Sequence, residues 1–531
     1  MPFALLFVTL LAVEDSRNPL PPRIDAHIVA GYPDFARQAA PKSDDAEFVR
    51  RVYLDLTGTI PTSAEVTAFL ADKSAGNRSK LINSLLDSPG FTRRMMWFYD
   101  VMLMERRGDA KVPRAAWEQY LRDVVNENRP YDVFVRELLS ADGSDPKTRP
   151  AAKFFLDRDL EPNLVTRDLS RIFLGRNLQC AQCHDHPNVD AYKQDEFYGI
   201  QAFLNRTFLF PNATAPTAII AEKAEGDVTF VSVFDKAKKQ NTTAPRMPGM
   251  KAIEEAKPEK GKEYKVAPAA NVRPVPTFSR RELLAGAITA ADNPAFARTA
   301  VNRLWAMLLG RGLVNSPEWD HSGNAPSHPE LLNLLAAEFV KHNYDVKWLL
   351  RRIALTDTYQ RSSAAPAGDA ELPPDRYLVA LLKPLTPEQF GYAISQASGQ
   401  TDADRIALGP KYTEAMVDAR VAPRIAPFRS TFSARAGEPQ DGFTATLDQT
   451  LFLKYGPTVR AMLATRAANL AKLTDSGAIA DELFLSVLSR PPAPEEKADV
   501  ADALKHAKDR NTTLTELVWA LVTSAEFRFN H

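Results

Sequence analysis

Two cysteines and a histidine stand side by side in the first half of the chain. The 531 residues contain only two cysteines, Cys180 and Cys183, and His184 follows directly after the second. This spacing is typical of covalent haem attachment. Thiols about one helical turn apart can reach both vinyl groups on one edge of a porphyrin, and the adjacent imidazole can then bind the iron from one face. The motif therefore predicts a c-type haem held by Cys180 and Cys183, with His184 as the proximal iron ligand.

The cysteine pair has three other possible uses. A redox dithiol of the thioredoxin type expects a βαβ setting, which the flanking sequence does not suggest. A zinc site needs four ligands, and His186 follows the motif too closely to complete a tetrahedron easily. A disulfide within the pair would close so small a loop that it would stabilise little. The pattern favours haem.

A sixth iron ligand, if there is one, must come from outside the motif. Met247 and Met250 lie in a segment that could fold over the haem, and a methionine ligand would raise its reduction potential, whereas a second histidine would lower it. We expect His186 to hydrogen-bond within its own loop, because it lies two residues beyond His184 and cannot easily reach the far face of the same iron. An open sixth position would instead give peroxidase-like or ligand-binding chemistry. Further candidates are His27, His321, His328, His342, His506 and His531.

The elements that position the motif are expected to be helices. Asn163–Leu174 has apolar residues at helical spacing and stops at Gly175, shortly before the motif, and Pro187 ends any continuation. We expect apolar cover for the haem from Phe173, Leu174 and Leu178. Ser or Thr also stands three residues before Glu or Gln repeatedly, which is the pattern of a helical capping box. These pairs are Thr62/Glu65, Ser279/Glu282, Ser327/Glu330, Thr386/Gln389 and Thr513/Glu516.

One region departs from the helical pattern. Helical periodicity is lost from Arg206 to Pro276, where Val228–Phe234 is β-branched and aromatic and Lys236–Pro276 is rich in Lys and Pro. We therefore predict a mainly α protein with two helical domains joined by a small β-containing, Lys/Pro-rich connector. The expected order is a signal segment and leader at 1–39, a cytochrome-like domain with the CxxCH motif at 40–205, the β element and connector at 206–278, and a helical C-terminal domain at 279–531.

Charge and hydropathy limit the classes of partner. Lys plus Arg and Asp plus Glu both number 66, so the net charge is zero and gives no electrostatic case for nucleic acid or an anionic membrane. Met1–Val13 is apolar enough for the core of an export signal, although a basic start and a clean cleavage site are missing. No other stretch is long and apolar enough to span a bilayer. We expect a periplasmic or secreted protein.

The motifs taken together resemble those of paired-domain secreted proteins of planctomycetes. In these proteins a cytochrome-like domain of unknown function precedes a planctomycete-type C-terminal domain of unknown function. The resemblance implies export and haem binding but no substrate. Asn188–Tyr192 departs from the family, which tends towards Phe-Asp and a Trp there. The matching segments are Phe48–Gly58, Ile60–Thr62, Phe173–Pro187, Asn293–Pro294, Asn302–Trp305, Gly310–Val314, Pro326–Leu332, Tyr359–Gln360, Asp448–Phe452, Leu488–Pro492 and Glu526–His531.

Two hypotheses for function follow, with a third from another class. The first is an exported electron-transfer cytochrome that docks a redox partner protein. The second is a haem enzyme, either peroxidase-like or acting on an extracellular polysaccharide, for which Asp320 and His321 would be a candidate acid/base pair. The third is a structural scaffold. We expect Asn302 and Arg303 to lie on a helix that tethers a neighbouring turn.

Overall fold

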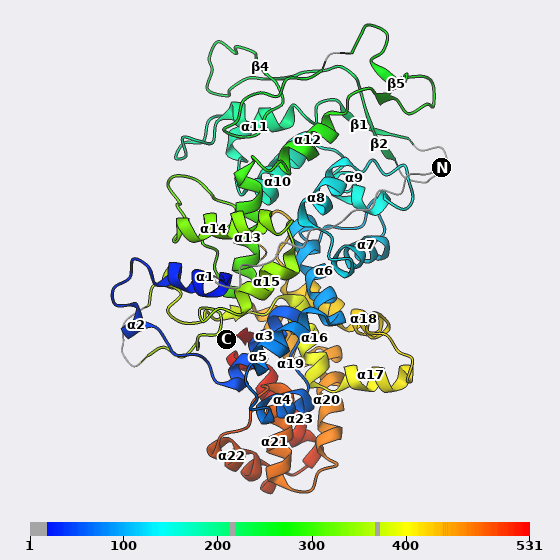
Figure 1. The fold of residues 1–531 in the computed structure, drawn as a ribbon. Coiled ribbons are helices and arrows are strands. Elements are labelled where there is room, and N and C mark those ends of the chain that lie inside the picture. The colour runs from blue at the N-terminus through cyan, green and yellow to red at the C-terminus, as the bar shows by residue number, and fades with distance from the viewer. Residues whose placement is uncertain are drawn as a thin grey trace, which may run out of the picture. The chain divides into compact units, whose positions relative to one another are not determined.

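The protein is mainly helical. The computed structural model describes residues 19–211, 218–256, 258–366, 372–438, 440, 442 and 444–531. Within these ranges helices dominate, and the short strands form four separate antiparallel pairs, β1–β2, β3–β4, β5–β6 and β7–β8 (Figure 1). Three of these pairs lie between Thr207 and Pro276. The predicted mainly α fold with a small β-containing connector is confirmed.

The chain divides into two compact units, each assembled from separate stretches. The first unit contains the chain up to Ile28, Arg107–Ala306 and Arg311–Leu350. The second contains Val29–Arg106, Met307–Gly310 and Arg351–His531. Each unit therefore takes segments from both halves of the sequence. The domain limits predicted along the chain, at 40–205, 206–278 and 279–531, stay a prediction. Of the signal segment and leader predicted at 1–39, the apolar Met1–Val13 lies outside the described residues.

The first unit holds the cysteine motif. Its core includes Trp117, Phe134 and Trp305, which are fully buried. Its elements are α1 (Leu20–Val29), α7 (Arg114–Asn126), α8 (Tyr131–Ser140), η1 (Arg149–Ala152), α9 (Lys153–Leu156), α10 (Pro162–Leu174), η2 (Cys180–Gln182), α11 (Gln194–Gln201), β1 (Thr207–Phe210), β2 (Ile219–Glu222), β3 (Val228–Phe230), β4 (Asn241–Thr243), β5 (Tyr264–Val266), β6 (Val275–Pro276), α12 (Arg280–Ile288), most of α13 (Pro294–Leu309), α14 (Pro329–Lys341) and the start of α15 (Val346–Ala354).

The second unit is built round a core of helices that includes Phe390, Met462 and Leu483. Its elements are α2 (Phe35–Gln38), α3 (Asp45–Thr57), α4 (Ser63–Ala71), α5 (Asn77–Leu86), α6 (Pro89–Met104), η3 (Pro374–Arg376), β7 (Lys383–Pro384), α16 (Pro387–Ala397), α17 (Gln400–Leu408), α18 (Glu414–Phe432), α19 (Leu447–Tyr455), α20 (Pro457–Leu470), α21 (Ser476–Val487), α22 (Pro494–Lys505), α23 (Arg510–Val522), α24 (Ala525–Arg528) and β8 (Phe529–Asn530).

A buried carboxylate joins distant stretches of the second unit. Asp55 on α3 accepts hydrogen bonds from Lys383 Nζ at 2.6 Å, Tyr359 Oη at 2.9 Å and Asn530 Nδ2 at 2.8 Å. Burial lowers the pKa of Lys383 to about 8, against the opposing pull of the Asp55 carboxylate. A buried charge of this kind is tolerated only when it is paired and hydrogen-bonded. Asp55 therefore ties segments that are hundreds of residues apart in sequence.

Three of the five capping pairs predicted from the sequence stand at the observed start of a helix. Thr62/Glu65 and Thr386/Gln389 form complete capping boxes, and the Ser279 side chain accepts from the Glu282 N–H. Two predicted boxes are wrong. Pro329 fixes the first turn of α14, so His328 is its N-cap and no side chain caps it. Helix α23 begins four residues earlier than the Thr513/Glu516 pair predicts, because the Asp509 carboxylate accepts from the Thr512 N–H at 2.9 Å.

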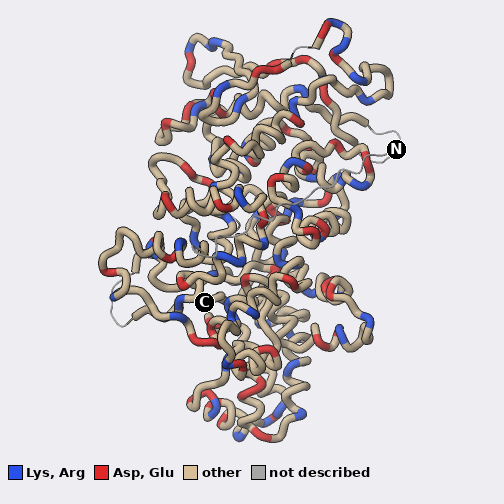
Figure 2. Tube along the Cα trace, in the orientation of Figure 1, with Lys and Arg blue, Asp and Glu red and all other residues tan. Residues whose placement is uncertain are grey.

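Charged residues of both signs are interspersed along the trace (Figure 2). This distribution agrees with the zero net charge. In the part of the chain that the structure describes, no helix combines the length and the apolar character needed to cross a bilayer.

Candidate functional site

Helix α10 delivers the chain to the cysteine motif. It starts with Pro162 in its first turn, and the Glu161 carboxylate accepts from the first free backbone N–H groups. It ends at Gly175, whose φ of 66° lies in the left-handed region. A Cβ at Gly175 would also lie 2.8 Å from Thr299 Oγ1, so both backbone conformation and space require glycine here. The helix and the stop predicted from the sequence are confirmed.

A buried carboxylate anchors α10. Asp168 and Arg158 are both fully buried, and Arg158 Nε lies 2.7 Å from Asp168 Oδ2. Arg167 lies 2.8 Å from the same carboxylate, and Arg171 and Arg107 lie at 3.6 and 3.7 Å. Burial alone would raise the pKa of Asp168, but the guanidinium groups of Arg158, Arg167 and Arg171 hold it below its ordinary value. Asp168 is therefore an ionised carboxylate that fixes α10, the helix leading to the motif, through its ion pairs.

The motif itself forms a tight turn. Cys180–Gln182 is a single turn of 3₁₀ helix, and the Cys183 N–H donates to the Cys180 carbonyl at 3.3 Å. Side chains three residues apart eclipse one another in this geometry, so the two thiols share one side of the turn. Both cysteines are exposed and neither forms a disulfide. Two accessible thiols on one side of a turn are what attachment to a single flat ligand needs.

The His184 ring is held through one nitrogen. Its Nδ1 lies 2.6 Å from the Asp185 carbonyl oxygen, and since a carbonyl only accepts, Nδ1 carries the proton. The lone pair of Nε2 then remains for another partner. Iron- and zinc-binding histidines are oriented in the same way, by donating their second ring N–H to a carbonyl or carboxylate. The contact of His184 Nδ1 with the Asp185 carbonyl is compatible with that orientation.

An exposed apolar surface adjoins the motif. After β3 the chain turns at Val231–Phe234, and the Val233 N–H donates to the Cys183 carbonyl at 3.1 Å. Val231, Val233 and Phe234 are 39%, 65% and 74% exposed, and the Phe234 ring centroid lies 4.8 Å from that of His184. We call these three residues the apolar wall. Clustered exposed apolar side chains commonly mark a binding surface.

The apolar wall corrects one expectation. Phe173, Leu174 and Leu178, which the sequence suggested as haem cover, are at most 2% exposed and belong to the core of the unit. The sequence predicts a β element over the whole of Val228–Phe234, but β3 ends at Phe230, whose ring stacks on Tyr198 with centroids 4.4 Å apart. The residues after Phe230 leave the strand and turn towards the motif.

His186 hydrogen-bonds within its own loop, as predicted. Its Nδ1 accepts from the Asn188 N–H at 3.2 Å, which puts the ring proton on Nε2. The ring meets Tyr192 and Trp319 edge to face, with centroids 5.8 and 6.0 Å away. Burial lowers the pKa of His186, and the neighbouring His321 and His184 lower it further. His186 is therefore a neutral ring packed among aromatic side chains.

Residues 23–208 match the family model PSCyt2, a protein of unknown function (DUF1549), and residues 280–424 match PSD1, a protein of unknown function (DUF1553). The two models occur as a pair in planctomycete proteins, and the pair is found here in that order. The chain belongs to this PSCyt2–PSD1 family. No curated protein and no solved structure matches it.

The two PSCyt2–PSD1 segments contribute unequally to the site. The PSCyt2 segment contains the whole motif from Cys180 to His184, whereas the apolar wall lies between the two matched segments. The two matches confirm the family that the sequence motifs suggest. Neither family model covers the apolar wall.

The polar residues of the PSD1 segment act as tethers. Asn302 Nδ2 donates to the Val314 carbonyl at 2.9 Å, and the Val314 N–H donates back to Asn302 Oδ1 at 3.0 Å. Arg303 donates to the Arg171 carbonyl at 2.9 Å. The predicted tethering role is confirmed.

Asp320 and His321 do not face each other as an acid/base pair would. Asp320 Oδ2 lies 3.6 Å from Arg298, and His321 Nδ1 accepts from the Gly323 N–H at 3.1 Å. The His321 ring packs on Tyr192 instead, with centroids 5.6 Å apart. Neither residue has a hydrogen bond to the other within the described ranges. The PSD1 segment therefore offers no catalytic pair at this position.

The methionines proposed as sixth ligands differ in access. Met247 is 3% exposed, whereas Met250 is 37% exposed and is linked to it by a hydrogen bond from its N–H to the Met247 carbonyl at 3.0 Å. Met250 is thus the more accessible of the two. The assignment of either methionine as the sixth iron ligand stays a prediction.

The ligands of the zinc alternative do not converge. Among the described residues no group of three or more His, Cys, Asp or Glu side chains is arranged to hold a metal ion directly.

Proposed function

We propose that the protein is an exported c-type haem protein, with one haem attached through Cys180 and Cys183, and that it transfers electrons outside the cytoplasm. When bound, haem would supply a one-electron redox centre. The proposal uses the chain's own residues in three roles: two thiols that attach, one imidazole that binds iron, and an apolar wall that limits access of water.

The attachment role rests on the 3₁₀ turn. Cys180 and Cys183 are both exposed and lie on one side of that turn. Each thiol would add across one vinyl group, so that a sulfur–carbon bond forms and the thiol hydrogen passes to the other vinyl carbon. The addition is neither an oxidation nor a reduction. It needs thiols that are free and reachable, which both are.

The observation that carries the proposal is the contact of 2.6 Å between His184 Nδ1 and the Asp185 carbonyl oxygen. The Asp185 carbonyl fixes the proton on Nδ1 and leaves Nε2 to bind. The loop that presents this carbonyl is held by the Gln194 N–H, which donates to Asp185 Oδ1 at 2.8 Å.

The apolar wall supports the same proposal. Val233 and Phe234 are large apolar side chains left largely exposed beside a pair of thiols. Covering them with a flat apolar ligand would remove that area from water, and burial of apolar surface contributes about 25 cal/mol per Å². It would also lower the local polarity around the iron, which is one of the ways in which proteins set a haem potential.

The visible spectrum of the matured protein tests the proposed role. We expect a c-type spectrum from material exported in a host that matures c-type cytochromes, with six-coordinate iron that cyanide and peroxide change little. Such a spectrum agrees with electron transfer. A high-spin spectrum that shifts on adding cyanide or peroxide would instead assign the protein to the class of haem enzymes. If the matured protein contained no haem, the hypothesis of a structural scaffold would be the one left.

A further inference from the structure

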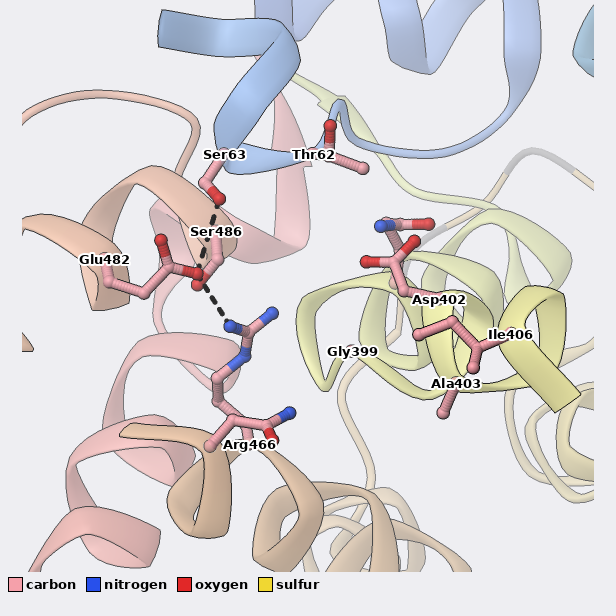
Figure 3. A pocket seen from close by; sticks show the side chains of 11 residues that line it. Thr62, Ser63, Gly399, Asp402, Ala403, Ile406, Arg466, Glu482 and Ser486 are labelled. Carbon is pink, nitrogen blue, oxygen red and sulfur yellow. Dashed lines mark hydrogen bonds and ion pairs between the residues drawn. The ribbon is translucent and has the colours of Figure 1, made fainter. Parts of the chain in front are cut away.

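The second unit contains a polar pocket that is separate from the cysteine motif. It has a volume of about 230 Å³ and lies among the start of α4, the end of α16, and helices α17, α20 and α21. Ser63, Glu482 and Arg466 line one side, and Asp402 and Ile406 on α17 line the other (Figure 3). The pocket thus gathers side chains that are widely separated in sequence.

Two buried side chains direct unused donors into this pocket. Arg466 is 8% exposed; its Nε donates to the Ala397 carbonyl at 2.6 Å and its Nη1 to Glu482 Oε1 at 2.8 Å. Gln396 is 5% exposed, and its Oε1 accepts from Thr401 Oγ1 at 2.5 Å. Within the described ranges neither Arg466 Nη2 nor Gln396 Nε2 has an acceptor. Neither atom belongs to the fully buried, unsatisfied polar atoms of the described residues, so both donors still reach solvent and a ligand in the pocket could replace water as their acceptor.

A glycine keeps the guanidinium open to the pocket. Gly399 has a φ of +76°, and a Cβ there would lie 3.5 Å from Arg466 Nη2 and 3.2 Å from Asn469 Nδ2. Any larger residue would therefore narrow the space in front of the free donor. Glycine at position 399, shortly after the end of α16, therefore leaves Arg466 accessible from the pocket.

The charges of the lining are balanced. Glu482 is paired with Arg466, and Asp402 is paired with Arg405 at 2.7 Å. No excess positive charge remains to favour an anion. The carboxylates still have free acceptor positions, and Ser63 Oγ lies 3.3 Å from Glu482 Oε1. Donors and acceptors are therefore mixed along the lining of the pocket.

This combination selects a class of ligand. A hydroxyl group donates and accepts at once, so a ring that carries several hydroxyls can satisfy free donors and carboxylate acceptors in the same pocket. Ile406, which is 81% exposed at the rim, offers an apolar contact for the C–H face of such a ring. We propose that this pocket binds a neutral polyhydroxylated ligand of the size of one monosaccharide unit. The inference does not depend on haem at Cys180 and Cys183.

Calorimetric titration of the full chain with neutral monosaccharides tests the proposal. Glucose, galactose, mannose and xylose form the panel, with sulfate and glucuronate as anionic comparisons. We expect at least one neutral sugar to bind with a Kd of about 1 mM, which is typical of a small ligand held mainly by hydrogen bonds. Absence of binding by every neutral sugar, or stronger binding by sulfate or glucuronate, would overturn the assigned class of ligand.

Variants of α17 test the location. Ala403 is exposed and lines the pocket, so Ala403→Phe should fill it and weaken binding at least about tenfold. Ala407→Phe is the matched control, since Ala407 is exposed on the same helix but does not line the pocket. Asp402→Asn is a second pocket variant, needed in case Ala403→Phe disturbs folding. It keeps the shape of the side chain, removes its charge and should also weaken sugar binding. Sugar binding that is unchanged in both pocket variants would place the site elsewhere.

Discussion

Replacing Asp168 by asparagine is expected to lower the free energy of unfolding by about 3–5 kcal/mol. Asparagine keeps the shape of the side chain, but it removes the charge that pairs with the fully buried Arg158 at 2.7 Å. Denaturant unfolding at neutral pH measures the change. Asp190→Asn is the control, because Asp190 is exposed, and it should leave the unfolding midpoint unchanged. Equal stability of the two variants would mean that the buried pair contributes nothing.

The same carboxylate predicts a pH dependence with a definite sign. Burial raises the pKa of Asp168 and the three nearest arginines lower it, with a net result below its ordinary value. A carboxylate whose folded pKa is depressed stabilises the fold above the unfolded pKa, about 3.9, and that contribution is lost as the pH falls through the folded pKa. The wild type should therefore lose more stability on acidification than Asp168→Asn does. Parallel losses would contradict the assignment.

Replacing His184 by alanine should change the spectrum of the matured protein far more than replacing His186 does. His184 has Nε2 free to bind iron, whereas His186 uses Nδ1 for the Asn188 N–H and packs its ring between Tyr192 and Trp319. Loss of His184 removes the proximal ligand and should make the spectrum sensitive to added imidazole, which can take the vacant position. His186→Ala is the matched control.

The outcome that would contradict this prediction is specific. If His186→Ala alone converted a six-coordinate iron into a five-coordinate one, His186 would be an axial ligand. The Cys183–Asn188 loop would then have to fold differently once haem is attached. If His184→Ala left the spectrum unchanged, the proximal ligand would have been assigned wrongly.

Local signals were sufficient for the helix that carries the motif. The apolar spacing of Asn163–Leu174 and the glycine after it predict α10 and its end, because both depend on backbone geometry within a few residues. Capping pairs failed where a competing local group lay closer to the true start, as Asp509 does for α23. Such competition is visible in the sequence only when every alternative cap is weighed.

Long-range contacts account for what the sequence could not predict. The apolar wall reaches the motif across about fifty residues of chain, through a backbone hydrogen bond that leaves no sequence pattern. The polar pocket joins residues from Ser63 to Glu482, each of which has an ordinary surface or helix-end character in sequence. Only the folded chain shows that their donors and acceptors face one another.

The central claim is that Cys180 and Cys183 bind haem covalently, and a haem stain after denaturing electrophoresis tests it most directly. The protein is produced with its export route in a host that matures c-type cytochromes, beside a known c-type cytochrome as a positive control. We predict a stained band at full length for the wild type and for His186→Ala, and none for the Cys180→Ala, Cys183→Ala double variant. An unstained wild-type band beside a stained control would contradict the claim.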